Sequence, residues 1–291
     1  MQKFIGTGVA LITPFKEDLS VDFDALVKLV NFNIENGTNY LVINGTTAES
    51  ATVSKEEKLQ IIALIVKTNA NRVPLVLGIG GNNTLEVITA IKTTDLTHID
   101  GILSVVPYYT KPTQEGVYQH FKAIAAATEK PIILYNVPGR TGKNMEASTT
   151  IRLAKDFVNI VGVKEAGNNV QQYLELLKNK PSDFLIISGD DDLALGITLA
   201  GGSGVISVIG QAYPKEFSTL INHGLEGENK EGYAIHFKMM TILDYIFEEN
   251  NPAGIKTVLQ ELGMCSNEVR LPLVKASEGL HDKIRNFVKT F

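Results

Sequence analysis

The sequence predicts an α/β protein, namely a (β/α)8 barrel of the TIM type followed by a helical appendage. Eight short apolar runs recur over about 220 residues, and helix-patterned stretches separate them. The last part of the chain carries only helical patterns. An open, doubly wound sheet would instead show a topological switch point and a glycine-rich phosphate fingerprint, and the sequence shows neither.

The predicted strands are nearly continuous apolar runs, as expected for strands that are buried on both faces of a parallel sheet. They lie at residues 9–12, 40–43, 73–77, 101–106, 131–135, 160–163, 184–187 and 204–208.

The predicted helices have apolar residues at intervals of three and four, and each stretch starts with a residue that can cap a helix. Clear examples lie at residues 22–36, 54–70 and 84–96. Strand signals are absent from residue 228 onward, so we expect a barrel domain over residues 1–227 and a helical region over residues 228–291.

Composition limits the classes of function. The formal net charge of -5 and the absence of a basic cluster argue against a nucleic-acid-binding protein. A single cysteine, Cys265, cannot form an intramolecular disulfide and fits a reducing compartment. The N-terminus lacks a long apolar segment, and no apolar stretch has the length of a membrane span. We therefore expect a cytoplasmic protein without nucleic-acid or membrane partners.

Metal and cofactor signatures are also missing. The five histidines are scattered singly, without the spacing of a zinc site. The glycine-rich segment 78–83 lacks the third spaced glycine of a dinucleotide site, and segment 201–204 precedes a strand. Residues 190–192 are three aspartates, but no further carboxylate or histidine lies at ligand spacing. Capping of the helix that follows at Leu193 is the better interpretation of this acidic run.

Lys164 directly follows the apolar run 160–163 and is the strongest candidate for a catalytic residue. It would lie at the carboxyl end of a buried strand, where α/β folds place their active sites. Burial disfavours the ammonium form, so the amine can become neutral and act as a nucleophile. The alternative is a lysine whose aliphatic stem passes the core to reach solvent.

Two other predicted strands are followed by polar segments. The hydroxyl-rich turn containing Thr46 and Thr47 opens toward a helix, and its backbone N–H groups could bind a carboxylate. After the fifth strand, Tyr135 would point into the top of the barrel, and Arg140 could bind a carboxylate through two parallel hydrogen bonds. The alternatives are a plain capped turn, a packed tyrosine and a solvated arginine.

Taken together, the motifs resemble those of the dihydrodipicolinate synthase family, within the class I pyruvate-dependent aldolase and lyase superfamily. The matching motifs are Gly45-Thr46-Thr47-x-Glu49, Tyr108-Tyr109, Tyr135-Asn136-Val137-Pro138-x-Arg140-Thr141 and Val163-Lys164-Glu165. The resemblance covers nearly the whole chain. It departs at Ala48, where the family usually has glycine; we expect the turn to survive if its backbone does not need a positive φ there.

The resemblance implies a Schiff-base-forming lyase that needs no metal or organic cofactor. Lys164 would form an imine with pyruvate, and the resulting enamine would add to aspartate semialdehyde. The product, 4-hydroxy-tetrahydrodipicolinate, serves lysine and diaminopimelate biosynthesis. Tyr135 would transfer protons, and Thr46 would link it to Tyr109 of a neighbouring subunit.

The same resemblance implies a substrate pocket and an assembly. Thr46 and Thr47 would hold the carboxylate of pyruvate, Arg140 would hold that of the semialdehyde, and Ile206 would line the site. The expected assembly is a homotetramer, a dimer of dimers that exchange Tyr109.

A regulatory site for lysine at the dimer interface is also implied. Matching positions are Ser50, Ala51, Gly80, Asn82, Glu86 and Tyr108. Glu86 could pair with the ligand's ammonium, while Asn82 and Tyr108 bind its carboxylate. Lys55 stands where sensitive bacterial relatives carry histidine, and we expect partial inhibition.

Two alternative functions stay open. N-acetylneuraminate lyases and 2-keto-3-deoxy sugar-acid aldolases of the same superfamily share the lysine and the tyrosine. Arg140 favours the synthase, because a semialdehyde carries a carboxylate where a sugar tail carries hydroxyls. The other alternative is a non-catalytic barrel that binds a small acid, but binding alone needs neither a buried amine nor a proton relay.

Overall fold

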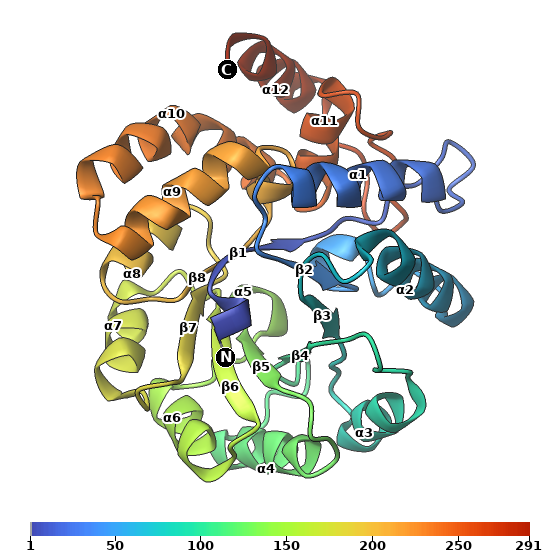
Figure 1. The fold of residues 1–291 in the computed structure, drawn as a ribbon. Helices are drawn as coiled ribbons and strands as arrows, with labels where there is room; N and C mark the ends of the chain where they lie inside the picture. Colours follow the sequence, from blue (N-terminus) through green and yellow to red (C-terminus); the bar gives the residue numbers. More distant parts are fainter. Residues whose placement is uncertain (1) are drawn as a thin grey trace.

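The computed structural model describes residues 2–291, and its centre is a closed barrel of eight parallel strands in chain order. Figure 1 shows the strands surrounded by helices. The strands are β1 Gly6–Ala10, β2 Tyr40–Ile43, β3 Leu75–Gly78, β4 Gly101–Val105, β5 Ile132–Asn136, β6 Ile160–Glu165, β7 Leu185–Ser188 and β8 Gly204–Ser207. Pairing of β1 with β8 closes the barrel. The predicted (β/α)8 TIM barrel is confirmed.

Helices follow the strands in alternation. They are α1 Phe23–Glu35, α2 Lys55–Asn69, α3 Thr84–Thr93, α4 Gln114–Ala125, α5 Pro138–Thr141, α6 Ala147–Asp156, α7 Val170–Asn179, α8 Ala194–Leu199 and α9 Pro214–Glu226, with short 3-10 turns η1 Gln2–Phe4, η2 Thr46–Ala48 and η3 Ile209–Gln211. Side chains of Asp22 and Ser54 cap α1 and α2, as the sequence predicted, whereas α3 is capped by Asn83, one residue before the predicted stretch. At Ser54 the cap is a reciprocal capping box with Glu57.

The first strand differs most from its prediction, because β1 spans Gly6–Ala10 instead of residues 9–12. Glycine has a low propensity for strands, so the prediction, which relied on the apolar run, left out the glycine-containing start of the strand. Gly8 has a specific packing reason: a side chain there would collide with the ring of Tyr40 on the neighbouring strand.

Two packed layers build the core. The outer layer fills the space between strands and helices. The inner layer fills the barrel and includes Tyr40, Val42, Tyr135, Ile187 and Ile206. Because side chains alternate between these layers along each strand, the inward residues at the carboxyl ends, Tyr135 among them, face the mouth of the barrel.

Three further helices, α10 Asn229–Glu248, α11 Ala253–Glu261 and α12 Glu278–Thr290, form the expected C-terminal helical part. In Figure 1, α11 and α12 lie at the end of the molecule beyond α1. The first seven residues of α11 are buried. The division at residue 227 stays a prediction, since α10 packs against α9 of the barrel. Within residues 2–291, no helix is both long enough and apolar enough to cross a membrane.

Candidate active site

Two adjoining cavities open at the carboxyl ends of the strands, where this fold places its active sites. The smaller, of about 530 Å³, is lined by Lys164 and by the aspartates after β7. The larger, of about 1240 Å³, extends toward α2 and α3. Thr46, Tyr135 and Arg140 line both cavities, so the structure brings these predicted site residues together with Lys164.

Lys164 on β6 lies in register with Tyr135 on β5. Its Nζ is 4.4 Å from the centre of the Tyr135 ring. Both residues are buried, at 6% and 7% exposure, yet both line the smaller cavity. Gly189 makes room for this arrangement, because a Cβ there would lie 2.9 Å from Lys164 Cε. A buried amine with access to a small cavity is the arrangement that imine chemistry requires.

The turn after β2 is the 3-10 element η2, closed by a hydrogen bond from the Glu49 N–H to Thr46 O at 3.1 Å. The left-handed residue of this turn is Glu49, with φ 54, whereas Ala48 keeps a helical backbone. The backbone at Ala48 therefore does not need a positive φ, which was the condition for alanine to replace the usual glycine there. Asn251 Nδ2 donates to Thr47 Oγ1 at 3.0 Å and holds the second threonine from outside the barrel.

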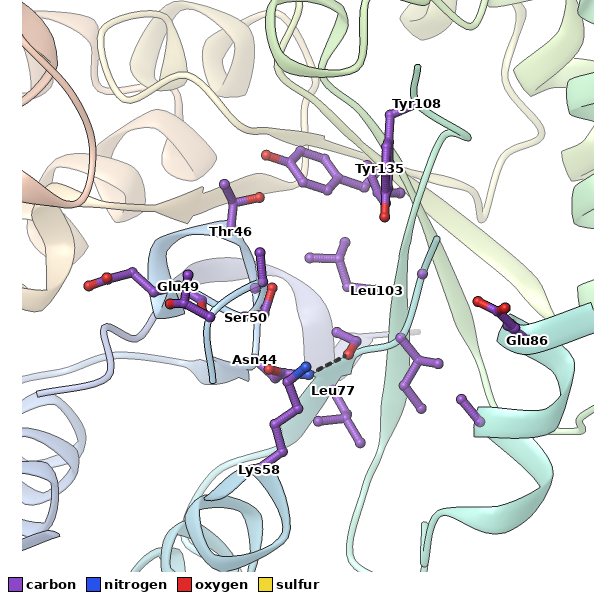
Figure 2. A pocket seen from close by; sticks show the side chains of 18 of the residues that line it. Asn44, Thr46, Glu49, Ser50, Lys58, Leu77, Glu86, Leu103, Tyr108 and Tyr135 are labelled. Atoms are coloured by element: carbon purple, nitrogen blue, oxygen red, sulfur yellow. Dashed lines mark hydrogen bonds between the residues drawn. The ribbon is translucent and has the colours of Figure 1, made fainter. Parts of the chain in front are cut away.

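Thr46 and Tyr135 face each other. Figure 2 shows their hydroxyl groups directed toward one another across the wall of the larger cavity. Tyr109 lies elsewhere: its side chain is 86% exposed and lines neither cavity of its own chain. Its backbone has φ 71, which is unusual for tyrosine. The relay from Tyr109 through Thr46 to Tyr135 stays a prediction.

Arg140 and Ile206 occupy different environments. Arg140 belongs to the short helix α5, and its Nη2 donates to Asn251 O at 3.4 Å. Its side chain lines both cavities, so its guanidinium is available to a carboxylate. Ile206 is fully buried in the inner layer of the barrel and does not line either cavity.

The acidic run after β7 does not cap α8, and that prediction was wrong. Leu193 is the N-cap residue, and no side-chain hydrogen bond caps the helix there. Instead, Asp191 Oδ2 accepts hydrogen bonds from the N–H groups of Val208 and Ile209, at 3.0 and 2.9 Å. Asp190 Oδ2 accepts from the N–H of Asn168 at 3.0 Å. The aspartates therefore tie the loops after β6 and β8 to β7, and burial raises the pKa of each to about 6.

A buried polar network beside Lys164 was missed in the sequence. Glu165 accepts hydrogen bonds from Asn136 Nδ2 at 2.9 Å and from Gln172 Nε2 at 2.8 Å. Burial raises the pKa of Glu165 to about 7, although these hydrogen bonds oppose the increase. Because Asn136 and Glu165 directly follow Tyr135 and Lys164, the network fixes the ends of both strands. The sequence did contain a signal for this network, because Glu165 is a carboxylate at the end of an apolar strand.

The residues expected to bind lysine lie at the other end of the larger cavity. Its walls include Ser50, Ala51, Lys55, Gly80, Glu86 and Tyr108. Asn82 is next to them, and its Nδ2 donates to Tyr108 O at 3.2 Å. Figure 2 shows Glu86 and Tyr108 on the α3 side of the cavity and Thr46 across from them. Regulation through this pocket stays a prediction.

Within residues 2–291, one group of side chains has metal-ligand geometry: His223, Glu226 and Glu228 at the end of α9. His223 Nδ1 already pairs with Glu228 Oε2 at 2.6 Å. The group lines neither of the two cavities.

The model of the Dihydrodipicolinate synthetase family matches residues 3–291. The chain belongs to this family. It is 56% identical over 289 residues to the 4-hydroxy-tetrahydrodipicolinate synthase of Flavobacterium psychrophilum, with 99% of each chain covered. It is 51% identical to the enzyme of the same name from Parabacteroides distasonis, with 98% of this chain and 96% of that one covered.

Solved structures of this family share the fold. The dihydrodipicolinate synthase of Aquifex aeolicus superposes with a TM-score of 0.95 at 41% identity, covering 99% of this chain and 98% of that one. The Acinetobacter baumannii enzyme complexed with pyruvate gives 0.95 at 40% identity, covering 98% of each chain. The Cyanidioschyzon merolae enzyme with lysine bound gives 0.94 at 36% identity, covering 99% and 98%.

Proposed function

We propose that this protein condenses pyruvate with L-aspartate 4-semialdehyde to give 4-hydroxy-tetrahydrodipicolinate, a step of lysine and diaminopimelate biosynthesis. The observation that carries the proposal is the buried amine of Lys164, 4.4 Å from the Tyr135 ring centre at the wall of the smaller cavity. The names of the relatives agree with this activity, and one of them has been crystallised with pyruvate.

Imine formation is the first step. Lys164 Nζ attacks the keto carbon of pyruvate, a C–N bond forms, and the ketone oxygen leaves as water. The imine withdraws electrons, so the pyruvate methyl group loses a proton and becomes the carbon of an enamine. That carbon forms a bond with the aldehyde carbon of the semialdehyde. The amino group of the second substrate then attacks the imine carbon, which closes the ring and frees Lys164.

Each step moves a proton, and Tyr135 is the proposed donor and acceptor. Its hydroxyl faces that of Thr46, as Figure 2 shows, so the two can form one end of a relay. We assign the other end to Tyr109 of a neighbouring subunit. The 86% exposure of this aromatic side chain supports the assignment, because aromatic residues are enriched in interfaces. The proposed assembly is a homotetramer built as a dimer of dimers.

Two carboxylates must be held in this reaction. The N–H groups of Thr46 and Thr47, at the start of the η2 turn, would bind that of pyruvate. Arg140, which lines both cavities, would bind that of the semialdehyde through paired hydrogen bonds. Ile206 would support the site from the barrel interior, where it packs in one cluster with Tyr135.

Borohydride reduction in the presence of pyruvate tests the proposal. Reduction should trap pyruvate on the peptide containing Lys164 and abolish activity. Lys164→Ala should fold normally, lose nearly all turnover and take up no label. Lys58→Ala is the matched control, since Lys58 is a half-buried lysine that lines the larger cavity, and this variant should be labelled like the parent. Label on another lysine, such as Lys111 or Lys143, would refute the assignment.

A further inference from the structure

A fully buried ion pair lies behind the η2 turn. Lys256 Nζ on α11 is 2.6 Å from Glu49 Oε1, and both side chains have 0% exposure. The pair is also satisfied by the backbone: Lys256 Nζ donates to Glu268 O at 2.7 Å, and the Arg270 N–H donates to Glu49 Oε2 at 2.9 Å. The Lys256 ammonium lies 4.1 Å from the centre of the Phe15 ring.

Stability alone does not explain such a pair. Removing two charges from water costs free energy that their mutual attraction often fails to offset, and well-packed apolar residues are frequently as stabilising. A fully paired buried network instead fixes its members in one arrangement.

Glu49 is the residue that closes the η2 turn. Its N–H donates to Thr46 O, and its own backbone is left-handed, a conformation that disfavours residues other than glycine. Glu49 borders the larger cavity, but its side chain is fully buried, and Figure 2 shows it directed away from Tyr135. Glu49 is thus placed to anchor the turn without contacting a substrate.

The groups that hold this turn come from the C-terminal part of the chain. Lys256 binds Glu49 across 207 positions of sequence, and Asn251 binds Thr47 across 204. Segment 268–270 supplies the remaining backbone partners of the ion pair. The C-terminal region therefore holds the turn through Lys256, which is fully buried, and through Asn251, which also lines both cavities.

We propose that Glu49 and Lys256 are positioning residues, which hold the N–H groups of Thr46 and Thr47 where they bind the carboxylate of pyruvate. This assignment rests on the proposed function. Groups that orient a reactant act through geometry, and a displacement of about 1 Å can reduce the rate by about a hundredfold. The pair should therefore affect pyruvate binding more than the chemical competence of Lys164.

The test uses the double variant Glu49→Gln/Lys256→Met, which removes both charges and nearly keeps both side-chain volumes. We expect a thermal midpoint close to that of the parent. The pyruvate concentration that gives half-maximal borohydride labelling of Lys164 should rise by at least about tenfold. At saturating pyruvate the labelling should still approach the parent's extent, which separates positioning from loss of the amine.

Glu57→Gln is the matched control. Glu57 pairs with the Arg270 side chain at 2.6 Å and so joins the same C-terminal segment to α2, but it does not contact Glu49 or Lys256. Its replacement should lower the thermal midpoint and leave the half-saturating pyruvate concentration unchanged. An equal rise in this control would show that any loosening of the C-terminal segment suffices, and would overturn the assignment.

The positioning role would likewise be overturned if the double variant folds and its half-saturating pyruvate concentration equals that of the parent. If the double variant does not fold, Glu49→Asp decides the matter, because it keeps the charge and shortens the side chain by one methylene. This variant should also need more pyruvate, and an unchanged requirement would contradict the inference. If the parent itself takes up no label, the proposed function fails, whereas equal labelling of parent and variants defeats the positioning role alone.

Discussion

Glu165 should make the stability of this protein decrease with increasing pH. Its carboxyl group is buried, and burial raises its pKa from an ordinary 4.5 to about 7 despite donors from Asn136 and Gln172. A carboxyl whose folded pKa exceeds its unfolded value stabilises the fold fully below the unfolded pKa. That stabilisation is lost as the pH rises through the folded pKa. The window therefore runs from about pH 4.5 to pH 7.

The magnitude follows from the two pKa values. The full difference corresponds to about 3 kcal/mol, of which about 2.5 kcal/mol falls between pH 5 and pH 8. With an unfolding entropy of about 2.1 cal/mol/K per residue, the 291-residue chain loses about 4 °C in thermal midpoint from this group. Glu165→Gln removes the titration and keeps an acceptor oxygen for Asn136 or Gln172.

The assay compares thermal midpoints of the parent and Glu165→Gln at intervals from pH 5 to pH 8. The parent's midpoint should fall by about 4 °C relative to that of the variant. Glu175→Gln, which replaces an exposed carboxylate on α7, should follow the parent at every pH. Parallel curves for the parent and Glu165→Gln would show equal folded and unfolded pKa values. A difference of opposite sign would show that the hydrogen bonds outweigh burial.

Three further outcomes are expected. Arg140→Ala should lower kcat/KM for aspartate semialdehyde by about a hundredfold, equivalent to about 2 to 3 kcal/mol, and spare imine formation with pyruvate; unchanged efficiency would favour a sugar-acid substrate. Sedimentation should show a homotetramer, and Tyr109→Phe should slow turnover without dissociating it; a fully active monomer would contradict the shared site. Millimolar L-lysine should partly inhibit the initial rate, and Glu86→Ala should abolish the effect; inhibition indifferent to Glu86 would place the pocket elsewhere.

Local patterns in the sequence were sufficient for the barrel. Continuous apolar runs mark strands buried on both faces, and capping residues such as Asp22 and Ser54 mark helix starts, because both signals act over a few residues. The start of β1 was missed because its glycines are required by packing and not by strand propensity: Gly8 leaves room for the Tyr40 ring of β2, and Gly6 has φ 98 and leaves room for Asn39. Contacts of this kind do not change the residue types at neighbouring positions in the sequence, so a local pattern cannot predict them.

In the candidate site, too, the residues marked by local patterns were predicted, and those defined by long-range contacts were not. Lys164, Tyr135 and Thr46 end strands or begin turns after them, so the architecture places them at one mouth. The groups that hold them were not predicted: Lys256 reaches Glu49 from 207 residues away. Its signal was a lysine within the apolar run of α11, which local reasoning cannot pair with a partner. The aspartates after β7 were misassigned because a helix followed them, whereas their true partners lie on other loops.

The link between Glu49 and Lys256 also has a consequence for how the protein is made. A ribosome releases the chain from its N-terminus, so all eight strands emerge before α11 does. Until residues 251 to 256 have emerged, Asn251 and Lys256 cannot reach the turn that each of them holds. A chain that ends before residue 251 therefore contains all eight strands but lacks both side chains that hold the η2 turn, so this turn gains its support only once the C-terminal helices have been made.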